Sequence, residues 1–150
     1  MRAPLAPSEG SLPRPEEVLP HRAPFLFLDA VTSCEAERVV ARRLFSASES
    51  FFQGHFPGRP VVPGVILIEA LAQTLGYWAL RERPGHWVLL TGVDAAKFSQ
   101  VVQPDEEVVF TVEVLKARRG LVVAQGRCHV GERQVAQAQI KGFLQPRDPR

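Results

Sequence analysis

The sequence predicts an α+β domain in which an antiparallel sheet curves around one long helix. Residues 65–80 are apolar or small except at Glu69, Gln73, Thr74 and the polar tip of Tyr77, so no polar face can be drawn on a helical wheel. Segments after this helix alternate between apolar and polar residues, which is typical of half-buried strands. Because a helix without a polar face has to be covered on most sides, the sheet is expected to wrap around it.

Short elements are expected before the helix. Residues 1–15 contain four prolines together with Ser and Gly, which predicts a disordered tail. A helical turn and two strands should follow, at residues 16–19, 25–31 and 38–45. Between Phe45 and Pro63 the density of Ser, Gly and Pro predicts a loop. The long helix should begin near Pro63, because proline is tolerated in a first helical turn.

The second half of the chain is expected to consist of strands. Their predicted ranges are 88–93, 107–114, 121–130 and 133–144. Arg118-Arg119-Gly120 and Gly131-Glu132 provide the turns between the last three of them. Residues 146–150 should be a flexible end, so the predicted domain covers residues 16–145.

Composition and charge are those of one globular domain. The chain has 150 residues, of which 45% are hydrophobic and 23% charged, and this is enough for a sizeable core. Its net charge of +2 is too small to indicate nucleic-acid binding but is compatible with an acidic protein partner. The N-terminus has no apolar run, which indicates no secretory signal. Glu69 and Gln73 at the centre of the helix argue against a membrane span.

The cysteine and histidine spacings predict neither a disulfide nor a metal site. Cys34 and Cys128 are far apart in the sequence, so we expect two reduced thiols and, from them, a cytoplasmic protein. The chain contains no HxH, HExxH or CxxC motif, and a zinc site would need ligands gathered from distant segments.

One histidine and one carboxylate are candidates for chemistry. His55 lies in a loop shaped by prolines and glycines, and Glu69 lies in the apolar helix, where a lone carboxylate is rarely kept without a use. The structural alternatives are a histidine packed between Phe56 and prolines, and a carboxylate paired with an arginine or capping backbone. Burial should favour the neutral, proton-donating form of Glu69. Gln73, one helical turn later, either orients this carboxyl or is a packing amide.

Four segments resemble the bacterial (3R)-hydroxyacyl-[acyl-carrier-protein] dehydratase family. They are LPHRAPFL at residues 19–26, FFQGHFPGRP at 51–60, PGVILIEALAQ at 63–73 and GVDAAKF at 92–98. The resemblance covers roughly residues 16–144, and a long motif in several parts is far more specific than a short pattern.

The resemblance implies a hot-dog fold, a dimer that family members often extend to a hexamer, and removal of water from a 3-hydroxyacyl chain on acyl carrier protein. It implies no metal and no organic cofactor. In that family the histidine and the glutamate of one active site come from different subunits, and they correspond to His55 and Glu69. The N–H of the glycine that corresponds to Gly64 binds the thioester carbonyl. Phe56 and Pro63 are expected to line the same site.

The chemistry agrees with these residues independently of the resemblance. Removal of a weakly acidic proton next to a thioester needs a base, for which His55 is suited, and a donor for the charge that builds on the carbonyl oxygen. The N–H of Gly64, in the first helical turn, has no partner within the helix and lies at the positive end of the helix dipole. A neutral Glu69 can protonate the departing hydroxide.

Two other functions remain as alternatives. A hot-dog thioesterase also uses a carboxylate on the long helix, but it needs a water aimed at the carbonyl. A non-catalytic acyl-binding module would have no need of His55 and Glu69. The combination of these two residues with Gly64 therefore favours the dehydratase.

The sequence also bears on where the carrier protein docks and on the role of His21. Family members commonly carry basic residues after Lys97-Phe98, where this chain has Ser99-Gln100. Encounter with the carrier protein is therefore expected either to be slower or to be directed by other arginines, such as Arg59, Arg118 and Arg119. His21 is expected to be a structural histidine bonded to backbone near the active-site loop.

Overall fold

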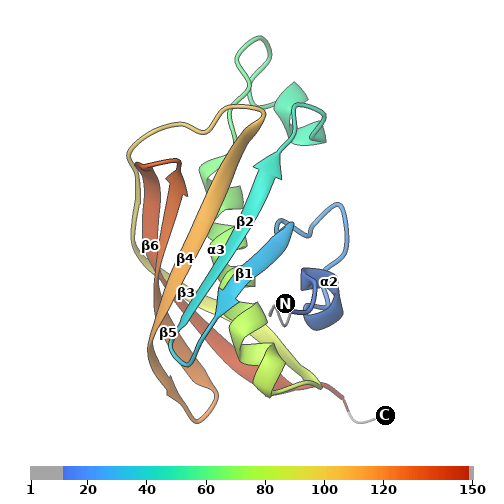
Figure 1. The fold of residues 1–150 in the computed structure, drawn as a ribbon, viewed down its shortest axis with the longest axis vertical. Helices are drawn as coiled ribbons and strands as arrows, with labels where there is room; N and C mark the ends of the chain where they lie inside the picture. The colour runs from blue at the N-terminus through green and yellow to red at the C-terminus, as the bar shows by residue number, and fades with distance from the viewer. Residues whose placement is uncertain (1–11, 149–150) are drawn as a thin grey trace, which may run out of the picture.

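The computed structural model describes residues 12–148 and shows one long helix packed against a six-stranded antiparallel sheet (Figure 1). The strands are β1 (Ala30–Cys34), β2 (Arg38–Phe45), β3 (His86–Phe98), β4 (Glu106–Arg118), β5 (Leu121–Val130) and β6 (Arg133–Pro146). The helices are α2 (Pro15–Val18), the 3-10 turn η1 (Ser50–Gln53) and α3 (Gly64–Glu82). The sheet order is β1-β2-β4-β5-β6-β3. The predicted α+β class is confirmed.

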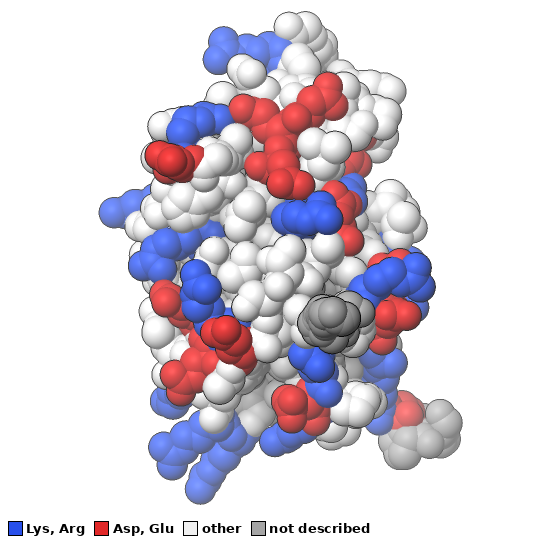
Figure 2. All heavy atoms as spheres, in the orientation of Figure 1, with Lys and Arg blue, Asp and Glu red and all other residues white. Residues whose placement is uncertain are grey.

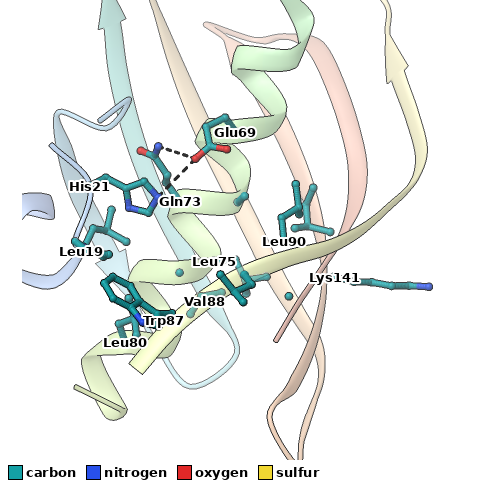
Figure 3. Close-up of a pocket in the computed structure, with 16 residues that line it drawn as sticks. Leu19, His21, Glu69, Gln73, Leu75, Leu80, Trp87, Val88, Leu90 and Lys141 are labelled. Carbon is teal, nitrogen blue, oxygen red and sulfur yellow. Dashed lines mark hydrogen bonds and ion pairs between the residues drawn. The ribbon is translucent and has the colours of Figure 1, made fainter. Parts of the chain in front are cut away.

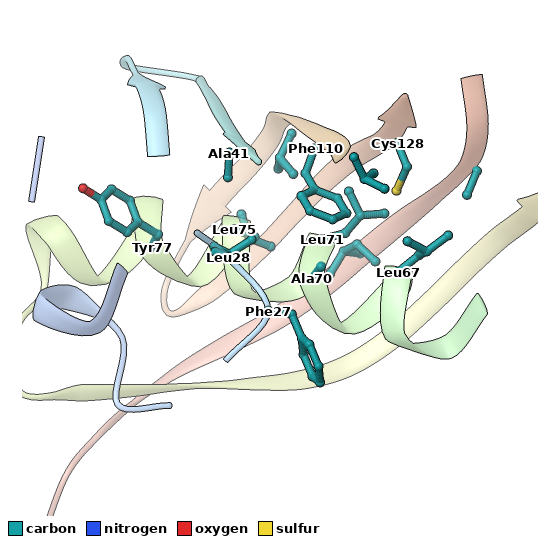
Figure 4. Packing of buried hydrophobic residues seen from close by; sticks show 14 of the residues in the cluster. Phe27, Leu28, Ala41, Leu67, Ala70, Leu71, Leu75, Tyr77, Phe110 and Cys128 are labelled. Atoms are coloured by element: carbon teal, nitrogen blue, oxygen red, sulfur yellow. The ribbon is translucent and has the colours of Figure 1, made fainter. Parts of the chain in front are cut away.

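The sheet curves around α3 (Figures 1 and 4), and strands β2, β4, β5 and β6 bury alternate side chains on the face toward the helix. Along β5, every second residue from Val122 to Cys128 is buried. Gly126 allows the closest approach, since a Cβ built there would lie 2.9 Å from Cδ2 of Leu71 on the helix. Phe110 and Leu75, both fully buried, belong to the same apolar cluster as Leu71. The helix therefore rests on a smooth, apolar sheet face.

The N-terminal segment covers a further side of α3. The hydroxyl of Tyr77 donates a hydrogen bond to the carbonyl of Pro13 at 2.6 Å, and Pro15 is buried at the start of α2. The packed domain therefore begins earlier than residue 16, because residues 12–15 lie against the helix. The rest of the expected N-terminal tail, residues 1–11, lies outside the described residues.

The C-terminal boundary also differs from the prediction. Strand β6 continues to Pro146, and the Arg147 side chain donates to the carbonyl of His86 at 3.1 Å. The Arg147 guanidinium also lies 4.3 Å from the centre of the Trp87 ring, a cation–π contact. Residues 146 and 147 thus belong to the fold, while 149 and 150 lie outside the described residues.

The strand predicted at residues 25–31 is wrong over most of its length. Strand β1 begins only at Ala30. The apolar residues before it do not pair with a neighbouring strand, because the Phe27 N–H donates to the side chain of Gln73 at 2.9 Å. This segment is held by α3 rather than by the sheet.

Strand β3 is the edge of the sheet, and much of it is uncovered. It pairs with β6 on one side and with no described strand on the other. Trp87, Leu89 and Leu90 are each more than 40% exposed. One stripe of α3 is also incompletely covered: Val65, Ile68, Glu69 and Ala72, at helical spacing, are exposed or only half-buried. The protomer therefore leaves an apolar edge and an apolar helix stripe open.

Among residues 12–148, no helix combines the length and the apolar character needed to cross a membrane.

Candidate active site

His55 is fixed by the loop between η1 and α3. Its backbone N–H donates to the carbonyl of Phe51 at 3.0 Å, and its own carbonyl accepts from the N–H of Val61 at 2.9 Å. The next residues form a tight turn, in which the N–H and carbonyl groups of Phe56 and Arg59 bond to each other at 2.8 and 3.0 Å. Gly58 takes a φ of +76° in this turn, which glycine adopts without strain. The prolines and glycines thus hold the histidine in place.

One ring nitrogen of His55 is left free to act as a base. The other, Nδ1, lies 3.0 Å from the carbonyl oxygen of Val61. Because a carbonyl only accepts, Nδ1 must carry the proton, and in the neutral imidazole Nε2 is then an unprotonated acceptor. The ring also stacks on Phe56, with 4.0 Å between centres. Phe56 thus packs on the histidine itself.

Glu69 and Gln73 meet on α3 as their spacing predicts (Figure 3). Nε2 of Gln73 donates to Oε2 of Glu69 at 2.9 Å. The Glu69 side chain is 22% exposed and therefore not fully buried. No arginine among the described residues forms an ion pair with it. The structural alternative of an arginine-paired carboxylate is therefore excluded within residues 12–148.

Gln73 also holds the segment that crosses α3. Its Nε2 donates to the carbonyl of Phe25 at 3.0 Å, and its Oε1 accepts from the N–H of Phe27 at 2.9 Å. Gln73 is 1% exposed. A buried amide with its groups satisfied in this way has a defined orientation. Gln73 is therefore more than a packing amide, because it couples Glu69 to the chain that follows His21.

His21 occupies a different place from the one expected. Its Nε2 lies 3.7 Å from Oε2 of Glu69, and its Nδ1 is buried without a hydrogen-bond partner in residues 12–148. The expectation that the His21 ring is hydrogen-bonded to the backbone is therefore wrong. The neighbouring Arg22 side chain makes such bonds instead, to the carbonyls of Leu19 and His21. Burial lowers the pKa of His21, although the Glu69 carboxylate opposes this shift. Spacing could not reveal this approach, because 48 residues separate the two.

Gly64 is the first residue of α3, and Pro63 is its N-cap. The Gly64 N–H donates no hydrogen bond to any described residue, as expected for the first turn of a helix. The ring of Phe98, at the end of β3, lies so close that a Cβ on residue 64 would be 2.9 Å from Cε1. The free N–H therefore lies beside an aromatic ring that leaves no space for a side chain.

A cavity of about 410 Å³ opens beside Glu69 (Figure 3). Three of its polar residues, His21, Glu69 and Gln73, lie at one end, away from Lys141, and apolar residues line it along α3 toward Leu80 and Trp87. The other residues with side chains in its lining are Leu19, Pro20, Ala72, Leu75, Val88, Leu89, Leu90, Ile140 and Lys141. An apolar cavity with a few polar groups at one end suits a ligand that is mostly hydrocarbon.

The predicted residues fall into two groups within one protomer. His55 and Gly64 are not among the described residues that line the cavity beside Glu69. The expected docking arginines are also separated: Arg59 lies in the loop before α3, whereas Arg118 and Arg119 form the β4–β5 turn at the other end of the sheet (Figure 1). Basic side chains gather at that end of the molecule (Figure 2). One protomer thus brings together Glu69, Gln73 and His21, but not the whole predicted site.

Other reactive groups do not join this site. Burial raises the pKa of the Cys128 thiol to about 12, and it also raises that of Cys34. Both thiols are free and are therefore protonated near neutral pH. Among residues 12–148, no cluster of three His, Cys, Asp or Glu side chains could hold a metal ion.

Most of the chain is similar to proteins of one family. The family model described as FabA-like domain matches residues 19–139. The 3-hydroxyacyl-[acyl-carrier-protein] dehydratase FabZ of Enterococcus faecalis is 44% identical in an alignment of 129 residues, and the match covers 83% of this chain and 91% of that protein. The FabZ of Chloroflexus aggregans is 40% identical in an alignment of 126 residues, and the match covers 82% of this chain and 88% of that protein.

Solved structures share the fold at much lower identity. A chain of the dehydratase heterocomplex ApeI:P from Xenorhabdus doucetiae has a TM-score of 0.79 at 19% identity, over 91% of this chain and 93% of that one. Cj0977, a sigma28-regulated virulence protein from Campylobacter jejuni, has a TM-score of 0.68 at 11% identity, over 87% and 95%. The predicted hot-dog fold is confirmed by these likenesses and by the family match.

Proposed function

We propose that this chain, which belongs to the FabA-like domain family, dehydrates (3R)-hydroxyacyl-[acyl-carrier-protein] to the trans-2-enoyl thioester. Its relatives at 38–44% identity carry the name 3-hydroxyacyl-[acyl-carrier-protein] dehydratase. The observation that carries the proposal is the carboxyl of Glu69, oriented by Gln73 at 2.9 Å, at the polar end of an apolar cavity. We infer that an acyl chain lying in this cavity has its third carbon beside the Glu69 carboxyl.

Three groups of the chain have separate roles in the reaction. His55 takes the proton from the carbon next to the thioester through Nε2, because Nδ1 is held by the carbonyl of Val61. The N–H of Gly64 receives the thioester oxygen, on which negative charge builds. Glu69 gives its proton to the hydroxyl on the third carbon, which departs as water. His55 then loses its proton to solvent and Glu69 regains one, which restores the starting state.

We further propose a homodimer that shares its two active sites. Within one protomer, His55 is not among the described residues that line the cavity beside Glu69, and the reaction needs both residues at one substrate. The exposed edge of β3 is a place where a second copy could add its own strand, since an uncovered edge has free backbone groups. The open apolar stripe of Val65, Ile68 and Ala72 beside Glu69 would be covered by the same partner.

For the carrier protein, we propose docking near Arg59 rather than at the β4–β5 turn. Arg59 is exposed and lies in the same loop as the base His55, whereas Arg118 and Arg119 lie at the opposite end of the sheet (Figure 1). An acidic carrier protein must deliver its thioester close to the base. Electrostatic attraction at Arg59 places the carrier there, whereas attraction at the β4–β5 turn does not.

The reaction is tested by mass spectrometry of the carrier protein. Purified protein is incubated with 3-hydroxyoctanoyl carrier protein, and loss of one water is the expected result. His55→Ala and Glu69→Gln should each lower the rate by about a hundredfold or more. Release of the free acid would indicate the thioesterase instead, and an unchanged mass would indicate an acyl-binding module; either result contradicts the proposal.

Sharing of the sites is tested by mixing two inactive variants. In a dimer of one His55→Ala and one Glu69→Gln subunit, a shared arrangement leaves one intact site, made of the remaining histidine and glutamate. Random mixing after dissociation should then restore about a quarter of the wild-type activity, because half of the dimers are mixed and each has one intact site. If each protomer had its own complete site, mixing would restore nothing.

A further inference from the structure

His21 and Glu69 face one shared space at the polar end of the cavity (Figure 3). The distance from His21 Nε2 to Glu69 Oε2 is 3.7 Å, which is too long for a direct hydrogen bond. It is shorter than two hydrogen-bond lengths of about 2.8 Å each. One oxygen atom can therefore lie within bonding distance of both groups at once.

The surroundings of His21 determine which nitrogen carries the proton. Nδ1 is buried and has no partner among the described residues. A buried N–H without an acceptor is rarer in proteins than an unused acceptor, so the proton belongs on Nε2, which faces the cavity. Burial also lowers the pKa of His21, against the raising effect of Glu69 and together with Arg22. The neutral ring thus directs one N–H toward Glu69.

Two sets of hydrogen bonds keep this N–H in place. The Arg22 guanidinium donates to the carbonyl of Leu19 at 2.9 Å and to that of His21 at 2.6 Å, which stiffens the turn. Gln73 donates both to the Phe25 carbonyl and to Glu69. One amide therefore sets the position of the Glu69 carboxyl relative to the segment that carries His21. Such fixed donors are what a reaction that develops charge requires.

We propose that the Nε2–H of His21 donates a hydrogen bond to the 3-hydroxyl oxygen of the substrate as this oxygen leaves. This inference rests on the proposed dehydratase function. When the C3–O bond breaks, its electron pair goes to the oxygen, and the proton of Glu69 forms the new O–H bond. The electrons of the C2–H bond become the C2=C3 double bond, and His55 takes that proton. His21 gives up no proton; it stabilises the charge on the oxygen before Glu69 has fully transferred its own.

Two substitutions separate this role from a structural one. His21→Gln keeps an N–H donor on a side chain of similar reach, whereas His21→Leu keeps apolar bulk and removes the donor. We expect His21→Leu to lower kcat by about a hundredfold, the usual effect of removing one such donor, and to weaken substrate binding by a much smaller factor. His21→Gln should recover most of that loss. Thermal unfolding of each variant checks that the fold is retained.

A binding measurement tests the hydrogen bond from His21 to the 3-hydroxyl in the absence of turnover. In a His55→Ala background, 3-hydroxyoctanoyl and octanoyl carrier protein are compared, because they differ only in the 3-hydroxyl. A hydrogen bond from His21 should make the hydroxyacyl form bind about two- to tenfold more tightly. That preference should weaken with His21→Leu, which leaves only the contact of the hydroxyl with Glu69, and should persist in full with His21→Gln. If His21→Leu fails to fold, His21→Asn takes its place, since its shorter amide cannot reach the same oxygen.

The results distinguish this inference from the proposed function. If the wild type removes water but the hydroxyl preference is the same with and without His21, the inference is overturned and the function stands. Equal loss of kcat in His21→Leu and His21→Gln would overturn it as well. If the wild type removes no water, both the function and the inference fail.

Discussion

The ring of Phe98 covers Gly64 at the beginning of α3, with Cε1 of the ring 2.9 Å from the place of a Cβ. We predict that Gly64→Ala lowers the free energy of unfolding by about 1 kcal/mol, the low end of the usual effect of overpacking, because the Phe98 ring is half exposed and can move away in part. Activity should fall further, because the displaced ring and the new methyl group crowd the N–H proposed to receive the thioester oxygen. Urea unfolding and turnover of 3-hydroxyoctanoyl carrier protein measure the two effects.

Gly54 is the matched control for this substitution. A Cβ on Gly54 would meet no heavy atom within 4 Å, and its φ of −104° suits any residue. Gly54→Ala should therefore change stability by less than about 0.5 kcal/mol. Phe98→Ala combined with Gly64→Ala should restore stability by removing the contact. If the double variant were no more stable than Gly64→Ala, the contact with Phe98 would not be the cause.

We expect replacement of Gln73 to lower both activity and stability. Gln73→Leu removes the donor to Glu69 and leaves the buried N–H of Phe27 without its acceptor. We expect kcat to fall by about ten- to a hundredfold, as for other groups that orient a reacting side chain. The free energy of unfolding should fall by about 1–3 kcal/mol, the cost of an unsatisfied buried group.

Thr74→Ala is the control for Gln73→Leu. Thr74 is equally buried on the neighbouring position of α3, but its hydroxyl donates to the Ala70 carbonyl in the same helix. The control should lose some stability and keep its kcat. A normal kcat in Gln73→Leu would show that Glu69 needs no help from the amide.

Sequence patterns predicted the parts of the fold that depend on local periodicity. The bounds of β2 and β5 agree with the predicted ranges, because each strand has one buried face and alternates regularly. Strand β3 is longer than the predicted 88–93, since both of its faces are largely exposed in the protomer and no alternation marks its ends. The apolar run at Phe25 resembles a strand, but its backbone groups bond to Gln73, which only the tertiary structure reveals.

The sequence could predict those contacts of the site that lie within one helix. The contact between Glu69 and Gln73 follows from their separation of four residues. The approach of His21 does not, because it depends on how the N-terminal segment crosses α3. Likewise, the distance between Arg59 and the β4–β5 turn follows from sheet topology, which periodicity leaves open (Figure 1).

Arg43 provides a third prediction, on stability. Its guanidinium donates to Glu49 at 2.6 Å and to Asp29 at 3.1 Å, and only 19% of its side chain is exposed. These contacts join β2 to the segment before β1 and to η1, which leads to His55. Arg43→Ala leaves two half-buried carboxylates without their cation, although Asp29 keeps the hydrogen bond from the Leu44 N–H, so the free energy of unfolding should fall by about 2–3 kcal/mol.

The neighbouring Arg42 is the control for Arg43. It bonds Glu107 at 3.3 Å, but both side chains are more than 40% exposed. Arg42→Ala should change the free energy of unfolding by less than about 1 kcal/mol, because exposed ion pairs contribute little. Equal losses in the two variants, measured by urea unfolding, would contradict the role given to Arg43.

The last prediction is a pH dependence of stability that comes from His21. Burial lowers its pKa in the folded protein below the ordinary value of 6.5. Between these two values the unfolded chain binds more protons than the folded one, so the free energy of unfolding falls as the pH drops. This contribution is fully present above the ordinary value and is lost as the pH falls through the folded one. His21→Gln does not titrate, so the variant should lose less stability than the wild type between about pH 7.5 and about pH 5.5. Urea unfolding at both pH values measures the difference, and equal losses would show that His21 is as readily protonated in the folded protein as in the unfolded chain.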